Sequence, residues 1–335
     1  MDFAGMSRQF VQYHPRIGHT YVPGIKARVP HETGGYLIRA NQAGFRSDRE
    51  FEARKKSGFR RVLLFGDSFT AGDGVSNSQR YGDLLEHEIA GLEVFNFGLP
   101  ASGTDQQYLA WQEYAVGIEH DAVVLGLYVE NIRRIVTRHR LYMNDRGEEV
   151  LYAKPYFSLE DGGGLRLHNV PVPREPLNAA DLPQDESAAV NRGGRLPALR
   201  GLANRIGLKQ MAQRLTRYQP VPEYDRADSP GWRLLRAILE RWQRESRVPL
   251  LVVPIPMHQH IDEVSSSVAL RARFQELSAD SGAVLHDPLP DLWRRTAEER
   301  RAFRFAQDAH FTRAGHAALA ASLAPALRAV LEPRA

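Results

Sequence analysis

The chain has 335 residues, of which 43% are hydrophobic and 25% are charged, enough to bury one large core or one core with a sizeable insertion. It contains no cysteine, which excludes disulfides, thiolate catalysis and cysteine-ligated metals. The formal net charge is +4, and the arginines are mixed with acidic residues instead of forming a basic stripe, so no nucleic-acid partner is expected.

The longest apolar stretches, residues 122–129 and 249–257, are too short to span a bilayer, and the N-terminus shows no apolar signal region. We therefore expect no transmembrane segment and a cytoplasmic protein, or a periplasmic one if a leader has been removed.

Residues 1–58 are rich in Gly, Pro, Arg and Tyr and show no sustained helical or strand period. They are interpreted as an irregular N-terminal extension packed on the main domain, which runs from residue 59 to 335. The sequence does not predict the oligomeric state.

From residue 60 onward, short apolar runs alternate with segments of helical period. Parallel strands need crossover connections long enough to hold a helix, so this alternation predicts an α/β domain with a parallel sheet covered on both faces. The expected strands are 60–66, 93–98, 121–129, 248–257 and 283–290, and the expected helices are 80–89, 104–117, 231–246, 267–282 and 312–333.

The period fades between residues 141 and 230, where glycines, prolines and arginines accumulate. A structureless loop of that length is uncommon inside a compact domain. This segment is interpreted as an insertion with local structure of its own, placed as a cover over the functional site.

The motif "LLFGDSFTAGDG" places Ser68 directly after a buried strand, on a Gly-Asp turn. A serine nucleophile needs that exposure, and its own backbone N–H lies close enough to stabilise an oxyanion. The alternative is that Ser68 only caps the segment that follows, as serines often do.

Near the C-terminus, "AQDAHFTRAGH" places Asp308 and His310 in a loop before the last helix, with Thr312 as its expected cap. An imidazole there can accept the serine proton, while the carboxylate orients the ring and stabilises the imidazolium. An ordinary surface pair is the alternative for this motif taken alone.

Two further loops, "NFGLPASGTDQQ" and "LGLYVENIRR", also follow predicted strands and so lie at the carboxyl edge of the sheet, where sites form in such folds. The first can supply a backbone N–H and the second the Asn131 amide as oxyanion donors. A turn or helix cap is the alternative role for Asn131.

Together these residues resemble the SGNH/GDSL hydrolase superfamily. "GDSFT" resembles its serine block, "NFGLPASGT" its glycine block, "YVEN" its asparagine block and "DAHFTRAGH" its Asp/His block, and the likeness covers roughly residues 36–140 and 232–331. "NQAGFR" also resembles a segment of bacterial members that tailor polysaccharides or natural products. The resemblance implies a three-layer, flavodoxin-like α/β/α fold and no cofactor.

The resemblance also implies the site. Ser68, His310 and Asp308 would form the triad, with the N–H groups of Ser68 and Ala101 and the Asn131 amide in the oxyanion hole. Three departures stand out: Ala101 occupies the usual glycine position, the aspartate lies two residues before the histidine where Gln307 would be the usual position, and Ile132 replaces an aspartate.

Other polar residues have simpler interpretations. His258 and His260 form an H-x-H pair without a third ligand at a recognisable spacing, so no metal is expected, and His316 is interpreted as a packed or surface residue. Asp67, Arg133 and Arg134 are the candidate substrate-binding residues, and an exposed charged helix is the alternative for these arginines and for Arg138 and Arg140.

The sequence therefore predicts a serine-dependent ester hydrolase acting on a carbohydrate or related small molecule, with acetyl as the expected acyl group. An O-acyltransferase using the same triad is the first alternative, since acceptor binding and water exclusion separate the two activities. A catalytically silent domain that binds a glycan or a partner protein is the second.

Overall fold

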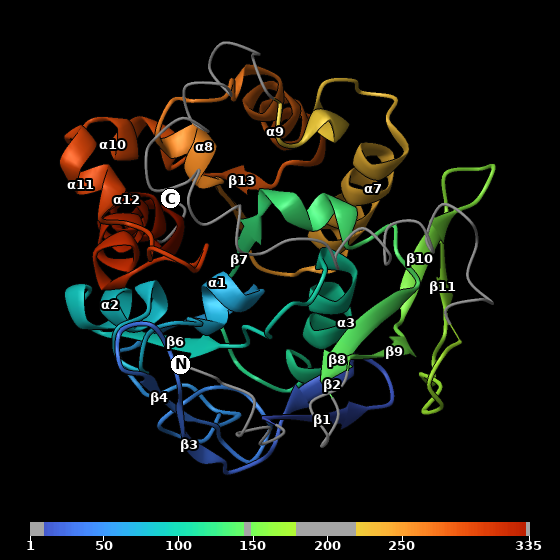
Figure 1. Ribbon diagram of the computed structural model, residues 1–335, viewed down its shortest axis with the longest axis horizontal. Helices are drawn as coiled ribbons and strands as arrows, with labels where there is room; N and C mark the ends of the chain where they lie inside the picture. The colour runs from blue at the N-terminus through green and yellow to red at the C-terminus, as the bar shows by residue number, and fades with distance from the viewer. Residues whose placement is uncertain (1–9, 144–148, 179–218, 333–335) are drawn as a thin grey trace.

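The structure, a computed structural model, describes residues 10–143, 149–178 and 219–332. At the centre of the described residues lies a five-stranded sheet in the order β13-β12-β7-β5-β6, with every neighbouring pair parallel (Figure 1). In chain order this is 2-1-3-4-5 read from β6, the order of flavodoxin-like folds. The strands are β5 (Arg60–Gly66), β6 (Leu92–Asn96), β7 (Ala122–Tyr128), β12 (Leu250–Ile255) and β13 (Val284–Leu285).

The central strands are continuous apolar runs because both faces of the sheet are covered. Every residue of β7 and β12 is buried. Along β5 the side chains alternate: Leu63 and Phe65 enter one core, whereas Val62 and Leu64 enter the other. The expected strand at 283–290 is only two residues long, since Pro288 and Pro290 follow and lack the N–H groups that a ladder needs.

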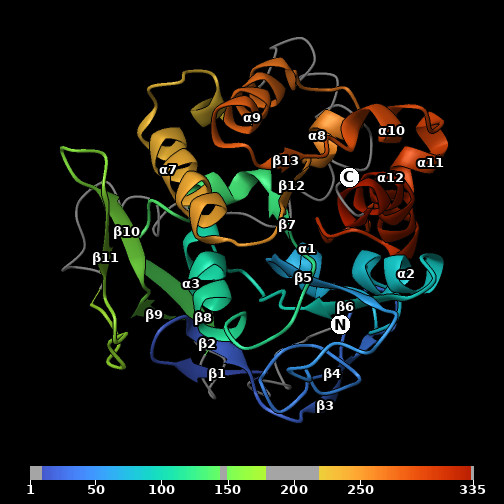
Figure 2. The ribbon, with the colours of Figure 1, turned by 180° about the vertical axis from the view of Figure 1, so that it is seen from behind.

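Helices cover both faces, which confirms the predicted three-layer α/β/α class (Figures 1 and 2). One face carries α3 (Thr104–Tyr114), α7 (Pro230–Glu245) and α9 (Val268–Ser281). The other carries α2 (Tyr81–Glu88), α10 (Leu289–Trp293) and α12 (Arg313–Leu331). The remaining short helices are α1 (Ser68–Ala71), α8 (His258–Ile261), α11 (Ala297–Arg301) and the 3₁₀ turns η1 (Val129–Arg133) and η4 (Pro222–Tyr224).

Helix α12 begins as the sequence predicts, with the Thr312 side chain accepting a hydrogen bond from the Gly315 N–H. Leu319, Leu323 and Leu327 form its buried stripe. Within the described residues this helix alone has the length and apolar composition that could cross a membrane, but here its leucines pack in the core.

The N-terminal extension is more regular than its sequence indicates. It forms two antiparallel hairpins, β1 (Val11–His14) with β2 (Gly18–Tyr21), and β3 (Lys26–Val29) with β4 (Tyr36–Arg39). Each strand has only four residues and is separated from the next by Pro or Gly, which is too short for an alternating pattern to emerge.

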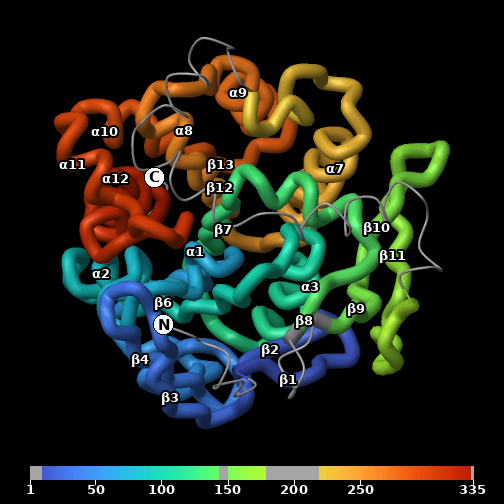
Figure 3. The backbone as a smooth tube through the Cα atoms, in the orientation of Figure 1, coloured from blue at the N-terminus to red at the C-terminus, as the bar shows by residue number. Residues whose placement is uncertain are grey.

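The described part of the insertion also consists of hairpins, formed by β8 (His139–Met143) with β9 (Glu149–Ala153) and β10 (Tyr156–Leu159) with β11 (Leu165–His168). Phe157 of β10 packs against Tyr108 of α3 and lies in the core with Trp242 of α7. Figure 3 shows β8 beside the β1–β2 hairpin, and the Val172 N–H donates to the Pro15 carbonyl at 2.7 Å. The expected cover formed by the insertion stays a prediction, because residues 179–218 lie outside the described part.

Candidate active site

The turn after β5 presents Ser68. A Cβ at Gly66 would lie 2.0 Å from Thr70 Oγ1 and 2.7 Å from the Gly126 carbonyl oxygen, so this position has room only for glycine. Asp67 then caps α1 by accepting a hydrogen bond from the Phe69 N–H at 3.0 Å. Ser68 follows at the carboxyl edge of the sheet with 4% of its surface exposed.

The structure brings Ser68, His310 and Asp308 into one hydrogen-bonded chain. Ser68 Oγ lies 2.8 Å from His310 Nε2, and His310 Nδ1 lies 2.6 Å from Asp308 Oδ1. The same carboxylate oxygen accepts the His310 backbone N–H at 2.9 Å. This local turn lets an aspartate only two residues before the histidine reach the imidazole. Gln307 contributes no side chain to this chain of contacts; its N–H binds Glu32.

The electrostatics of the pair suit a base and its partner. Burial by itself raises the pKa of Asp308, but the hydrogen bond and charge of His310 outweigh burial and leave the pKa of this carboxyl well below its usual range. Burial by itself lowers the pKa of His310, but Asp308, together with the charges of Asp73 and Asp67, raises it above its ordinary value. His310 can therefore hold a proton taken from Ser68.

Aromatic and histidine side chains fix the His310 loop. The Phe69 ring lies 4.9 Å from the His310 ring and stacks on Tyr128 at 4.1 Å. His258 Nε2 lies 2.8 Å from the carbonyl oxygen of Ala309, the residue between Asp308 and His310, and so donates its N–H to it. His258, the first histidine of the H-x-H motif, therefore supports the loop that carries His310.

Two candidate oxyanion donors have unusual features. Ala101 has a φ of +59°, the left-handed region in which glycine is favoured, so the alanine takes the backbone form that glycine would. Asn131 is fully buried, and neither its side-chain nitrogen nor its oxygen has a hydrogen-bond partner among the described residues. A buried amide without partners is costly, and the expected role of Asn131 as an oxyanion donor stays a prediction.

Asp67, Arg133 and Arg134 all contact protein groups in the structure, and their expected role in substrate binding stays a prediction. Both Asp67 oxygens are occupied, one by the Phe69 N–H and the other by Arg134 Nη1 at 3.0 Å, and the residue is fully buried. Arg134 also donates to the Ser102 carbonyl, tying the serine turn to the glycine-block loop. Arg133 pairs with Glu223 at 2.6 Å. These side chains stabilise loops around the site.

Sequence analysis missed a contact between the N-terminal extension and the triad. His31 Nε2 lies 3.3 Å from Asp308 Oδ2, the oxygen that His310 does not use. Beside it, Glu32 accepts the backbone N–H groups of Gln307 and Asp308. The extension lacks a periodic pattern, and a single histidine in such a segment carries no signal of this role.

Two other residues of the extension brace the opposite side of the site. His19 Nε2 lies 2.9 Å from the carbonyl oxygen of Pro100, next to Ala101. Arg46, which is fully buried, donates to the carbonyls of Gly72 and Val75, both at 2.8 Å, in the loop after Ser68. Arg46 is the last residue of the "NQAGFR" segment, which is recognisable in the sequence, but the sequence does not indicate what Arg46 contacts.

The other histidines singled out in the sequence are packed residues. His316 stacks on Tyr81, and its Nδ1 accepts the Tyr81 N–H at 3.3 Å. His260 is 1% exposed, and burial lowers its pKa to about 4. Within residues 10–143, 149–178 and 219–332, no three His, Cys, Asp or Glu side chains gather in a group that could hold a metal ion.

No family model and no curated protein sequence matches the chain. Among solved structures it is similar to a member of the lipolytic protein G-D-S-L family from Veillonella parvula, with 12% identity, a TM-score of 0.42, and coverage of 80% of this chain and 98% of that one. It is also similar to the lipase/acylhydrolase from Enterococcus faecalis, with 15% identity, a TM-score of 0.40, and coverage of 83% of this chain and 100% of that one. A third similar structure is the acetyl xylan esterase AlAXEase, with 12% identity, a TM-score of 0.43, and coverage of 80% of this chain and 99% of that one. The activity of the chain therefore has to be inferred from its own site.

Proposed function

We propose that this chain is an SGNH-type serine esterase that removes O-acyl groups from a carbohydrate through an acyl-enzyme. The observation that carries the proposal is the pair of contacts of 2.8 Å and 2.6 Å that link Ser68 Oγ, His310 and Asp308. Nucleophile, base and orienting carboxylate each lie within hydrogen-bond reach of the next, as this chemistry requires.

In the first half-reaction, Ser68 Oγ attacks the ester carbonyl carbon and its proton moves to His310 Nε2. The negative charge on the carbonyl oxygen is stabilised by the N–H groups of Ser68 and Ala101 and by the Asn131 amide. The C–O bond to the alcohol then breaks, and His310 returns the proton to the departing oxygen. Water repeats the sequence on the acyl-enzyme and releases the free acid.

A small acyl group such as acetyl suits the surroundings of Ser68. The serine is 4% exposed, and the Phe69 ring, which stacks on Tyr128, lies 4.9 Å from the His310 ring, so the nucleophile is largely shielded from solvent. The same shielding supports the second candidate, an acyltransferase, because transfer to a sugar hydroxyl requires that water be kept from the acyl-enzyme.

The test is hydrolysis of p-nitrophenyl acetate by the wild type, Ser68→Ala and a control, Ser281→Ala, whose serine ends α9, donates to the Leu277 carbonyl and accepts the Ala283 N–H. Loss of the nucleophile is expected to lower kcat by at least about 10³, since the remaining site lacks covalent catalysis. The control is expected to retain the wild-type rate.

A fluorophosphonate probe followed by peptide mapping checks the nucleophile without relying on the fit of one ester. Labelling is expected on Ser68 alone. Equal hydrolysis by wild type and Ser68→Ala, together with no label on Ser68, would rule the proposal out. Adding a sugar acceptor and measuring acylated product separates transfer from hydrolysis.

A further inference from the structure

Two adjoining pockets extend from the candidate active site. The first, of about 290 Å³, reaches the site at Ala101 and Asp73, and the second has a volume of about 300 Å³. They share Val11, His19 and Tyr142 as a common wall. We call the two pockets together the trough. The volume of each pocket is close to the lower limit of about 300 Å³ for ordinary ligand sites.

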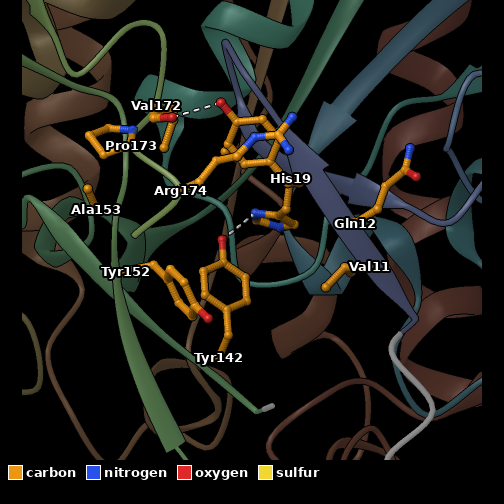
Figure 4. Close-up of a pocket in the computed structure, with 11 residues that line it drawn as sticks. Val11, Gln12, His19, Tyr142, Tyr152, Ala153, Val172, Pro173 and Arg174 are labelled. Atoms are coloured by element: carbon orange, nitrogen blue, oxygen red, sulfur yellow. Dashed lines mark hydrogen bonds between the residues drawn. The ribbon is translucent and has the colours of Figure 1, made fainter. Parts of the chain in front are cut away.

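Apart from Asp73, Pro100 and Ala101, the trough is built by segments outside the central α/β unit. The β1–β2 hairpin contributes one side, and β8, β9 and residues 172–174 contribute the other, as Figure 4 shows for the second pocket. His19 donates its Nε2 hydrogen to Pro100, so its Nδ1 accepts the Tyr142 hydroxyl at 2.8 Å. This bond and the Pro100 contact connect the wall of the trough to the Ala101 turn.

The wall is aromatic and largely neutral. Tyr142 and Tyr152 lie edge to face with ring centroids 5.8 Å apart, and Tyr13 stands across the second pocket. Burial lowers the pKa of His19 to about 3, so this ring is uncharged at neutral pH. Rings of this kind present apolar faces beside hydroxyl groups, which suits the alternating faces and edges of a sugar.

Among the described residues, two guanidinium groups in the trough form no ion pair with an acidic side chain. Arg140 forms no ion pair or hydrogen bond through its side chain with the described residues and lies 5.6 Å from the Tyr142 ring centre. Burial lowers its pKa to about 10, so it keeps its charge at neutral pH. Arg174 lies 4.3 Å over the Tyr13 ring and likewise has no carboxylate partner in the described chain.

Asp73 is the one acidic side chain of the described residues that lines the trough, and the buried Arg46 lies near its loop. Asp73 lies in the loop whose Gly72 and Val75 carbonyls bind the buried guanidinium of Arg46, and that guanidinium has only neutral acceptors. Asp73 and Arg46 interact through their charges.

Arg140 also feels the charges of Asp67 and Asp73, but it forms no ion pair with either of them. Arg140 is half-buried, and a cation in such a position without an ion-pair partner is unfavourable unless a ligand supplies one, whereas Arg174 is exposed.

We infer that the trough binds the alcohol part of the ester, and that this part is a sugar carrying a carboxylate or phosphate held by Arg140. The inference rests on the proposed esterase function and names its substrate class. The planar guanidinium fork matches both anions with two parallel hydrogen bonds. Arg174, at the far end, would meet a second acidic residue of a longer chain.

The experiment compares kcat/KM for three monoacetylated substrates: a methyl glucuronoside, methyl glucoside 6-phosphate and neutral methyl glucoside. Wild type is expected to prefer at least one charged ester over the neutral one by about tenfold or more, because a charge-assisted contact is gained in the transition state. The two charged arms distinguish carboxylate from phosphate. The preference should weaken as salt is raised, since the site is open to screening.

The variants are Arg140→Gln, Arg174→Gln and the control Arg328→Gln, whose arginine pairs with Glu88 on α2. Arg140→Gln is expected to bring the ratio of kcat/KM for charged over neutral esters close to one. Arg174→Gln is expected to affect only oligomeric substrates, and the control is expected to keep the wild-type ratio. Equal rates on all three esters by the wild type would overturn the inference and leave the esterase proposal intact.

Calorimetric titration of the Ser68→Ala protein with tri-glucuronate and with a neutral trisaccharide tests the trough without catalysis. Binding of the acidic sugar that is lost on adding Arg140→Gln supports the inference, even if every ester proves inert. Equal affinity for both sugars, or no effect of Arg140→Gln, would overturn it.

Discussion

His31 and His310 hold the same carboxylate from opposite sides: Asp308 Oδ1 lies 2.6 Å from His310 Nδ1, and Asp308 Oδ2 lies 3.3 Å from His31 Nε2. Thr33 Oγ1 lies 3.1 Å from His31 Nδ1, and the ring centroids of Phe305 and His31 are 4.4 Å apart. The N-terminal extension therefore completes the hydrogen bonding of the triad carboxylate.

His31→Ala is expected to lower kcat by about tenfold with little change in KM, because a hydrogen bond to a charged group is lost and Asp308 is less firmly oriented. His31→Gln, which keeps a donor at a similar reach, is expected to recover part of the rate. Steady-state kinetics on p-nitrophenyl acetate make the comparison. Equal losses for both variants, matched by equal losses of stability, would mean that His31 only holds the extension in place.

Asn131→Ala separates catalytic from structural roles. The buried amide has no hydrogen-bond partner among the described residues, so the free energy of unfolding measured in urea should change little. The kcat should fall by about 10²–10³ if the amide stabilises an oxyanion. A large loss of stability with unchanged kcat would assign Asn131 to the fold instead.

Ala101→Gly is expected to stabilise the protein by about 1 kcal/mol, because it relieves a left-handed alanine. The control is Ala115→Gly, at the end of α3 with a φ of −73°, where glycine adds chain entropy and should destabilise. Urea unfolding of both variants gives the comparison. Destabilisation by Ala101→Gly would show that this turn is not strained.

The pH dependence of kcat/KM follows from His310, whose neutral form is the base. Its pKa is raised above the ordinary value of 6.5, so activity should rise with pH through an apparent pKa above 6.5. Asp73 contributes to this shift by its negative charge, and Asp73→Asn should therefore move the acid limb to lower pH. Asp161→Asn, in the exposed β10–β11 turn, should leave the profile in place. An unmoved limb in Asp73→Asn would remove Asp73 from the electrostatics of the base.

The sequence by itself determined the central architecture and the candidate triad. Buried parallel strands are continuous apolar runs and amphipathic helices repeat every three or four residues, so β5, β7, α7 and α12 could be recognised from local pattern. Ser68, Asp308 and His310 follow turns and caps that are likewise local.

Only the tertiary structure decided what surrounds them. His31, His19 and Arg46 act through contacts with Asp308, Pro100 and Gly72, which lie far away in the chain, and no local pattern encodes such pairings. The pairing of Asp67 with Arg134 and of Arg133 with Glu223 is likewise visible only in the tertiary structure, and the expected role of these residues in substrate binding stays a prediction. Arg140, which forms no ion pair within the described residues, is the arginine that we assign to a ligand.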